Sequence, residues 1–136
     1  MAGEYAVGGF SVPAGVTAVH TLMEQVAGEH PSLTEDLMAF ETAVVELVGN
    51  IIEHARPPGE VRWHLSLEVH DDRVEGLLRD EAAPDERLPA LGSAEMPDVT
   101  SEDGRGLALA AVLLDELEHL ADADGGNVWR LVRRRR

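Results

Sequence analysis

The spacing of hydrophobic residues predicts two helices in the first part of the chain. Over residues 14–28 an apolar residue recurs every three or four positions, which is typical of a helix with one buried face. The same period continues from about residue 32 to Ala55 and stops before Pro57, which disfavours the helical conformation in the residue before it. Thr34 is the expected N-cap of this second helix, because its hydroxyl can accept a backbone N–H bond there.

A strict alternation of apolar and polar residues over 61–70 predicts a strand with one buried and one solvated face. Residues 73–79 are expected to form the return strand of a hairpin, after a short turn at Asp71 and Asp72. Short apolar segments at 9–12 and 127–132 predict two further strands. These elements indicate one sheet that includes a hairpin.

The remaining pattern predicts a long loop and a third helix. The loop covers residues 80–103 and is rich in Pro, Ala, Asp and Glu, a length that is typical of a functional or disordered segment. A helix is expected over 107–120, and Arg133–Arg136 is expected to be a solvated basic tail. The order of elements predicts an α+β fold in a single domain (1–136), with a mixed, mostly antiparallel sheet covered by helices on one face.

Composition and charge exclude several classes of function. The 136 residues carry 11 basic and 26 acidic side chains, for a net charge of −15, and all of the basic residues are arginine. Such a charge argues against binding to nucleic acid or to anionic lipid. Without cysteine there is no disulfide or thiolate metal site, and without lysine there is no P-loop lysine. No apolar run reaches the roughly 18 residues of a membrane span. No signal peptide is apparent, so a cytoplasmic location is expected.

A polar stripe on the second helix is the first candidate site. Glu46, Asn50 and His54 follow one another at intervals of four residues, so they span roughly 80° along the edge of the apolar face. A carboxylate in such a position can accept a proton from an attacking hydroxyl. An amide oxygen one turn away can ligate Mg²⁺, which prefers oxygen ligands. The alternative is an ordinary polar boundary beside the core.

Two further segments add candidate chemistry. Asp80 follows the return strand, where its carboxylate can accept a hydrogen bond from the exocyclic amine of a base or can simply form a turn. The segment Gly104-Arg105-Gly106-Leu107 precedes the third predicted helix, where backbone N–H groups and the helix dipole favour an anion such as phosphate. The alternative is a glycine loop that enters a buried helix.

Taken in order, these motifs resemble those of the GHKL (Bergerat-fold) ATPases. Residues 46–54, E-L-V-G-N-I-I-E-H, resemble the N-box; Asp80 stands where the aspartate of the first glycine box is expected; and Gly104–Leu107 resemble the second glycine box. The loop of about 84–103 would be the ATP lid. The resemblance covers nearly the whole chain and is greatest to the anti-sigma-factor serine/threonine kinases of the RsbW and SpoIIAB type. It implies a Bergerat-type two-layer α/β sandwich.

The resemblance also implies roles for the candidate residues. ATP and Mg²⁺ would be the cofactors, with Glu46 as the catalytic base and Asn50 as the metal ligand. Asp80 would select adenine, while His54 and the segment 104–107 would contribute to nucleotide binding. The implied partners are a sigma factor and an anti-anti-sigma (STAS) protein, whose serine or threonine would be phosphorylated, and a homodimer is also implied.

One position departs from the family pattern. The first glycine box usually reads D-x-G, whereas Ala82 stands at the glycine position here. A methyl group there restricts the backbone and adds bulk beside a nucleotide. This departure favours an alternative function, a nucleotide-binding module that sequesters a partner without phosphoryl transfer. A third interpretation, an ATPase domain that serves a larger assembly, fits the same motifs.

Overall fold

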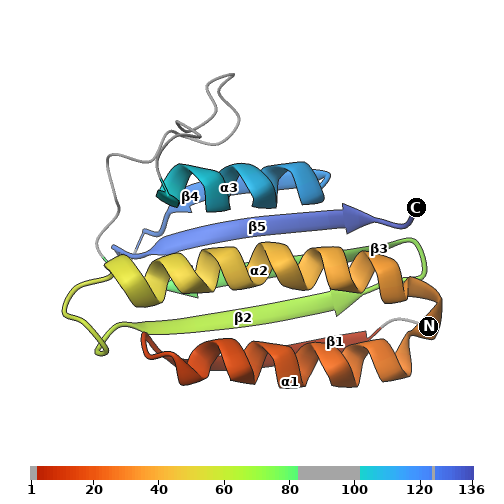
Figure 1. The fold of residues 1–136 in the computed structure, drawn as a ribbon, viewed down its shortest axis with the longest axis horizontal. Helices are drawn as coiled ribbons and strands as arrows, with labels where there is room; N and C mark the ends of the chain where they lie inside the picture. The colour runs from red at the N-terminus through yellow and green to blue at the C-terminus, as the bar shows by residue number, and fades with distance from the viewer. Residues whose placement is uncertain (1–2, 83–101, 124) are drawn as a thin grey trace.

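Five strands form one sheet, and three helices cover one of its faces (Figure 1). The computed structural model describes residues 3–82, 102–123 and 125–136. The order of the strands across the sheet is β1-β2-β3-β5-β4. The strands are β1 (Gly3–Phe10), β2 (Arg62–Val69), β3 (Arg73–Asp80), β4 (Glu116–Ala121) and β5 (Asn127–Arg134). The helices are α1 (Ala14–Glu29), α2 (Thr34–His54) and α3 (Glu102–Leu113), and a 3-10 turn, Pro31–Leu33, joins the first two.

The predicted α+β two-layer fold is confirmed, with one refinement of the sheet. Every pairing between the described strands is antiparallel, so in this part of the chain the sheet contains no parallel pair of the kind that a mixed sheet requires. The strand predicted over 9–12 begins earlier in the structure, at Gly3, and pairs with β2 over its full length.

The hydrophobic core lies between the sheet and the helices, as the two sequence periods require. On β2 the side chains of Trp63, Leu65, Leu67 and Val69 are buried, while the residues between them face the open side of the sheet or are half-buried. The buried stripe of α2, which includes Phe40, packs against this layer. Burial of each such side chain contributes about 1.5–3 kcal/mol relative to exposure, so this layer holds α2 in place on the sheet.

The helix predicted over 107–120 is wrong at both ends. Helix α3 begins at Glu102 and ends at Leu113, and the following residues form the edge strand β4. The backbone N–H of Asp115 donates to the carbonyl of Val132 at 2.7 Å, which starts the pairing with β5. A short apolar run is compatible with either a helix or a strand, and here the neighbouring strand decides.

The start of α2 also differs from the prediction. Thr34 is the first residue of the helix rather than its N-cap, and its hydroxyl donates to the carbonyl of Pro31 at 2.8 Å. The residue before it, Leu33, occupies the cap position and buries its side chain in the core. Hydrophobic anchoring therefore replaces side-chain capping at this end.

The C-terminal arginines form the predicted solvated tail only in part, because Arg134, Arg135 and Arg136 are exposed but Arg133 is not. Arg133 and Arg134 belong to β5, and the Arg133 side chain is only 13% exposed. Its Nε donates to Asp36 Oδ1 at 3.1 Å, and one of its terminal nitrogens donates to the carbonyl of Leu113 at 2.8 Å. Arg136 donates from its backbone N–H to Asp36 Oδ2 at 3.3 Å. The prediction is wrong for Arg133 because a carboxylate almost 100 residues away in sequence receives its side chain.

Most of the expected ATP lid, residues 84–101, lies outside the described residues. Only its last two residues, at the start of α3, are described as helical. Among the described helices, none is both long enough and apolar enough to cross a membrane.

Candidate functional site

The polar stripe of α2 lies where the sequence predicts it, along the edge of the buried face. Glu46 and Asn50 are half-buried, and His54, the last residue of the helix, is exposed. The Nε2 atom of His54 lies 3.7 Å from the Glu53 carboxylate, close enough for an ion pair when the imidazole is protonated. Because Leu47 and Ile51 on the adjacent face are buried, the backbone under the stripe is held firmly against the core.

Helix α3 packs against Glu46 through a glycine. A Cβ placed on Gly106 would lie 2.5 Å from Glu46 Oε2, closer than real Cβ atoms approach other atoms. Glycine at this position therefore lets the α3 backbone lie directly beside the carboxylate. The structure thus brings together one residue from each of two predicted motifs, Glu46 from the first and Gly106 from the third.

We expect Gly106→Ala to displace the Glu46 carboxylate without unfolding the protein, because the atom in the way is the end of a flexible side chain. The matched control is Gly49→Ala on α2, where an added Cβ meets nothing within 4 Å. Alanine in a helix interior is worth about 0.5–1 kcal/mol over glycine, so this control should be more stable than wild type. Urea unfolding gives the free energy of unfolding of both variants and of the wild type. A Gly106→Ala variant that gains as much stability as Gly49→Ala would contradict the close contact.

The glycine segment lies inside α3 rather than in a loop before it. Because α3 begins at Glu102, Gly106 is in its second turn, where backbone N–H groups are used within the helix. Leu107 is 3% exposed and belongs to the core, so its side chain serves packing. Gly104 and Arg105 lie in the first turn of the helix, and their side-chain environment is outside the described residues. The N–H groups free to bind an anion are therefore those of the first turn.

Asp80 is a buried carboxylate at the end of β3. Only 6% of the residue is exposed, and it pairs across the sheet with Trp63 on one side and Asn127 on the other. Its Oδ1 atom accepts hydrogen bonds from the Ala82 backbone N–H at 3.0 Å and from Asn127 Nδ2 at 2.9 Å. Burial raises the pKa of the Asp80 carboxyl, while these two donors and nearby His119 act in the opposite direction.

Two polar residues that the sequence reasoning missed complete this group. Asn127 is 6% exposed at the start of β5, and its Oδ1 lies 2.8 Å from His119 Nε2 on β4. The imidazole of His119 also packs against Trp129, with ring centroids 4.4 Å apart. The local signal in the sequence is an asparagine directly after two glycines. The contact with Asp80 follows from strand register, which the sequence alone does not reveal.

The two glycines directly before β5, Gly125 and Gly126, allow Asn127 to lie close to Asp80. Gly125 has a φ of +96°, which favours glycine in the turn before the strand. A Cβ on Gly126 would overlap the backbone carbonyl of Asp80. Any larger residue at 126 would therefore push β5 away from Asp80 and break the contact with Asn127.

Ala82, which departs from the family pattern, fits the observed backbone. The described chain contains no non-glycine residue with a positive φ, so Ala82 does not adopt a conformation that requires glycine. Its N–H donates to Asp80, its carbonyl accepts from Asn127 Nδ2 at 3.3 Å, and its side chain packs on the core. The methyl group is therefore accommodated in this conformation.

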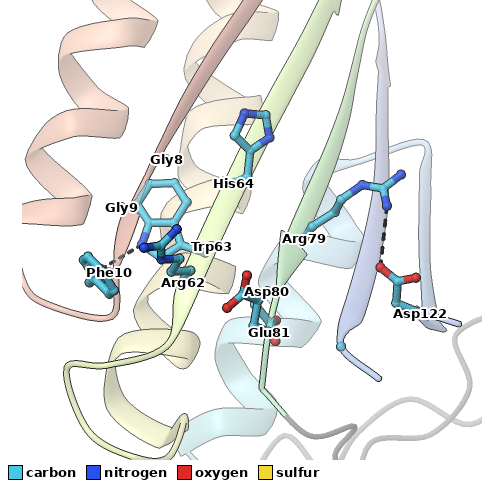
Figure 2. Close-up of a pocket in the computed structure, with 11 residues that line it drawn as sticks. Gly8, Gly9, Phe10, Arg62, Trp63, His64, Arg79, Asp80, Glu81 and Asp122 are labelled. Atoms are coloured by element: carbon cyan, nitrogen blue, oxygen red, sulfur yellow. Dashed lines mark hydrogen bonds and ion pairs between the residues drawn. The ribbon is translucent and has the colours of Figure 1, made fainter. Parts of the chain in front are cut away.

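A cavity of about 780 Å³ opens at the same end of the sheet (Figure 2). Figure 2 shows the Arg62 guanidinium beside Phe10, with its central carbon 5.2 Å from the ring centroid, and Arg79 directed toward Asp122. The described lining residues include Asp80 and Glu81, but not Glu46, Asn50 or Gly106. The lining residues are Gly8, Gly9, Phe10, Arg62, Trp63, His64, Arg79, Asp80, Glu81, Asp122 and Gly126. Several of these, including His64 and Arg79, are exposed strand residues. Because no described residue of α2 lines the cavity, it is largely separate from Glu46 and Asn50.

Comparisons with known structures and proteins give a likeness in fold over nearly the whole chain and a short sequence match. The solved structure of the RsbU and RsbW domains of Rv1364c from Mycobacterium tuberculosis aligns with a TM-score of 0.67 at 14% identity. The alignment covers 98% of this chain but only 32% of that one, and at this identity it shows the fold alone. A stretch of 58 residues is 40% identical to the pre-mRNA-splicing factor SYF1 of Eremothecium gossypii, covering 41% of this chain and 7% of that protein. So short a segment carries no argument about function.

A family model accounts for nearly all of the chain. Residues 11–133 match the histidine kinase-like ATPase domain, a span that begins directly after β1 and ends one residue before the end of β5. The span includes Glu46 and Asn50 on α2, Asp80 at the end of β3 and the glycine-containing start of α3. By this match and by its fold, the chain belongs to the histidine kinase-like ATPase domain family.

Proposed function

We propose that this protein is an anti-sigma regulatory factor that binds Mg·ATP and phosphorylates a serine or threonine of an anti-anti-sigma (STAS) partner. The observation that carries the proposal is the position of Glu46. Its half-buried carboxylate lies against the α3 backbone at Gly106, one turn before Asn50. A half-buried carboxylate contributes no hydrophobic packing, so its fixed position is not explained by the core. A phosphotransferase, by contrast, needs a base held in a fixed position.

The residues present suit the proposed cofactors. Asn50 offers an amide oxygen, and Mg²⁺ prefers such oxygen ligands while it keeps water and phosphate in its remaining positions. When bound, the metal ion would neutralise charge on the phosphates. Asn50 would hold it, with the first turn of α3 directed at the phosphates and Arg105 supplying positive charge.

The catalytic roles follow from these positions. Glu46 would accept the proton of the acceptor hydroxyl as its oxygen bonds to the γ-phosphorus and the bond from that phosphorus to the β,γ-bridging oxygen breaks. ADP would leave with the released negative charge, which the α3 N-terminus would help to stabilise. Asp80 would accept a hydrogen bond from the exocyclic amine of adenine. His54, at the C-terminal end of α2, would lie at the margin of the site. In this mechanism positioning and electrostatics supply most of the catalysis.

The partners rest on the family resemblance and on the likeness in fold to a structure that contains RsbU and RsbW domains. We propose a sigma factor and a STAS protein as alternative partners, a homodimer as the working unit, and a cytoplasmic location. The second candidate function is a module that sequesters its partner without phosphoryl transfer. Ala82 at the glycine position of the first box is the observation that favours it.

Calorimetric titration with ATP and Mg²⁺ tests the nucleotide proposal. A ligand present at 100 times its dissociation constant should stabilise the folded protein by about 2.7 kcal/mol. Thermal shift in parallel reports this gain. Absence of heat and of any shift at millimolar ATP would overturn the proposal.

We expect Asp80→Asn to weaken ATP binding more than pyrophosphate binding, because only the base contact is lost. The same change should not lower the free energy of unfolding at neutral pH. Asparagine keeps an acceptor for Ala82 and Asn127, and it removes a carboxylate whose ionised form burial disfavours, as the raised pKa of Asp80 indicates. A raised pKa means that stability is lost as pH rises through it, so the advantage of asparagine should vanish at acidic pH. Equal losses for ATP and pyrophosphate would make Asp80 a turn residue only.

A further inference from the structure

A chain of hydrogen bonds runs through three strands at the end of the sheet where the base is proposed to bind. His119 on β4 contacts Asn127 on β5, and Asn127 contacts Asp80 on β3. All three side chains lie on the helix-covered side of the sheet. Asp80 is opposite Trp63 and Asn127, and His119 is opposite Trp129 in the next row of the same face. Asn127 and Asp80 are both buried, so water does not replace these bonds freely.

The chemistry of the partners determines how the Asn127 amide is oriented. Its nitrogen faces two acceptors, Asp80 Oδ1 at 2.9 Å and the Ala82 carbonyl at 3.3 Å. Only an NH₂ group can satisfy both, so the amide oxygen must be the atom that faces His119. His119 therefore donates from Nε2, and it can do so both as the neutral Nε2–H tautomer and as the imidazolium.

The same hydrogen bonds give the two carboxylate oxygens of Asp80 different roles. Oδ1 accepts from Asn127 and from the Ala82 N–H, which fixes the plane of the carboxylate. A buried carboxylate that is held by two donors has little freedom to rotate. The other oxygen, Oδ2, is then the one that a ligand amine would find in a defined direction.

We propose that Asn127 and His119 are positioning residues that orient Asp80 for the exocyclic amine of adenine, and so set selectivity for the base. This inference rests on the proposed nucleotide function. It extends the site to two residues outside the motifs and to the edge strand β4. Neither residue touches the nucleotide in this scheme, since both act through Asp80.

A pair of nucleotides that differ only in the amine tests the inference. Purine riboside triphosphate is ATP without its 6-amino group, and inorganic triphosphate reports the phosphate contacts alone. In the wild-type protein with Mg²⁺, we expect ATP to bind at least about tenfold more tightly than purine riboside triphosphate, the value of one hydrogen bond of about 1.4 kcal/mol. In Asn127→Leu this ratio should fall to nearly one, while affinity for triphosphate stays within about twofold.

A second pair of variants keeps the inference testable if Asn127→Leu fails to fold. His119→Phe keeps a ring against Trp129 but removes the donor, and His119→Gln restores a donor of similar reach. We expect the amine-dependent ratio to drop severalfold in His119→Phe and to recover in His119→Gln. A purely structural role would lower affinity for both nucleotides equally and leave the ratio unchanged.

The outcomes distinguish a failure of the proposed nucleotide function from a failure of the positioning role of Asn127 and His119. If wild type does not bind ATP, or does not distinguish the two nucleotides, the proposed function or the role of Asp80 in it fails. If wild type distinguishes them and every variant does so equally well, only the positioning role of Asn127 and His119 is overturned. A ratio lost in Asn127→Leu and rescued by His119→Gln supports the whole chain of bonds.

Discussion

Replacing Glu46 by glutamine is expected to slow transfer of the γ-phosphate to a STAS partner by about 10²–10⁴-fold, which is what general-base catalysis contributes. Glutamine keeps the shape of the side chain beside Gly106 but cannot accept a proton. Binding of Mg·ATP should remain nearly intact, because the proposed metal ligand is Asn50. Radiolabelled ATP with the purified partner measures transfer, and calorimetry measures binding.

Two further variants sharpen this result. Asn50→Ala removes a ligand rather than a base, so it should lose metal-dependent binding as well as transfer. Glu35→Gln, an exposed glutamate at the opposite end of α2, should change neither by more than about twofold. If wild type captures a sigma factor but never labels any partner, the sequestering module is the correct function. Ala82→Gly then tests whether restoring the family's residue restores turnover.

Breaking the ion pair between Asp36 and Arg133 is expected to cost about 3–5 kcal/mol of unfolding free energy, the usual result of leaving one buried charge without its partner. The two side chains are 5% and 13% exposed and lie 3.1 Å apart between Oδ1 and Nε. Arg133→Met strands the Asp36 carboxylate in the first turn of α2, where the helix dipole and the Arg136 N–H compensate only part of the loss. Urea unfolding at neutral pH gives the measurement.

The neighbouring Arg134 supplies a matched control. Its side chain pairs with Glu116 at the surface and is 60% exposed, so Arg134→Met should cost no more than about 1 kcal/mol. The double change of Asp36→Leu with Arg133→Met removes both charges and should be more stable than Arg133→Met alone. Equal losses for Arg133→Met and Arg134→Met would show that the buried position of Arg133 is not decisive.

Much of the architecture follows from local periodicity. The strict alternation over 61–70 is enough to define β2 and its buried face, because only a strand places every second side chain on one side. The helical stripe of α2 likewise places Glu46 and Asn50 at the edge of the core, where the structure has them. These features depend on residues within one or two turns of each other, so no knowledge of the rest of the chain is needed.

The misassigned segments are those in which local preference is balanced. Residues 116–121 carry an apolar and polar mixture that suits either a helix or a short strand, and only the backbone of β5 beside them makes β4 a strand. The sequence pattern also places the start of the third helix too late, because residues 102 and 103 fall within the predicted loop whereas α3 begins at Glu102. Its position beside α2, with Gly106 against Glu46, is a property of packing.

The amino-acid sequence by itself determined the strand and helix faces of the core and the set of acid, amide and glycine residues that identify the family. Only the tertiary structure decided which residues from distant parts of the chain meet. Asp36 with Arg133, Glu46 with Gly106, and Asp80 with Asn127 and His119 are separated by dozens of residues along the chain. Such contacts depend on strand order and register, and these are set by the collective burial of the core rather than by any local signal.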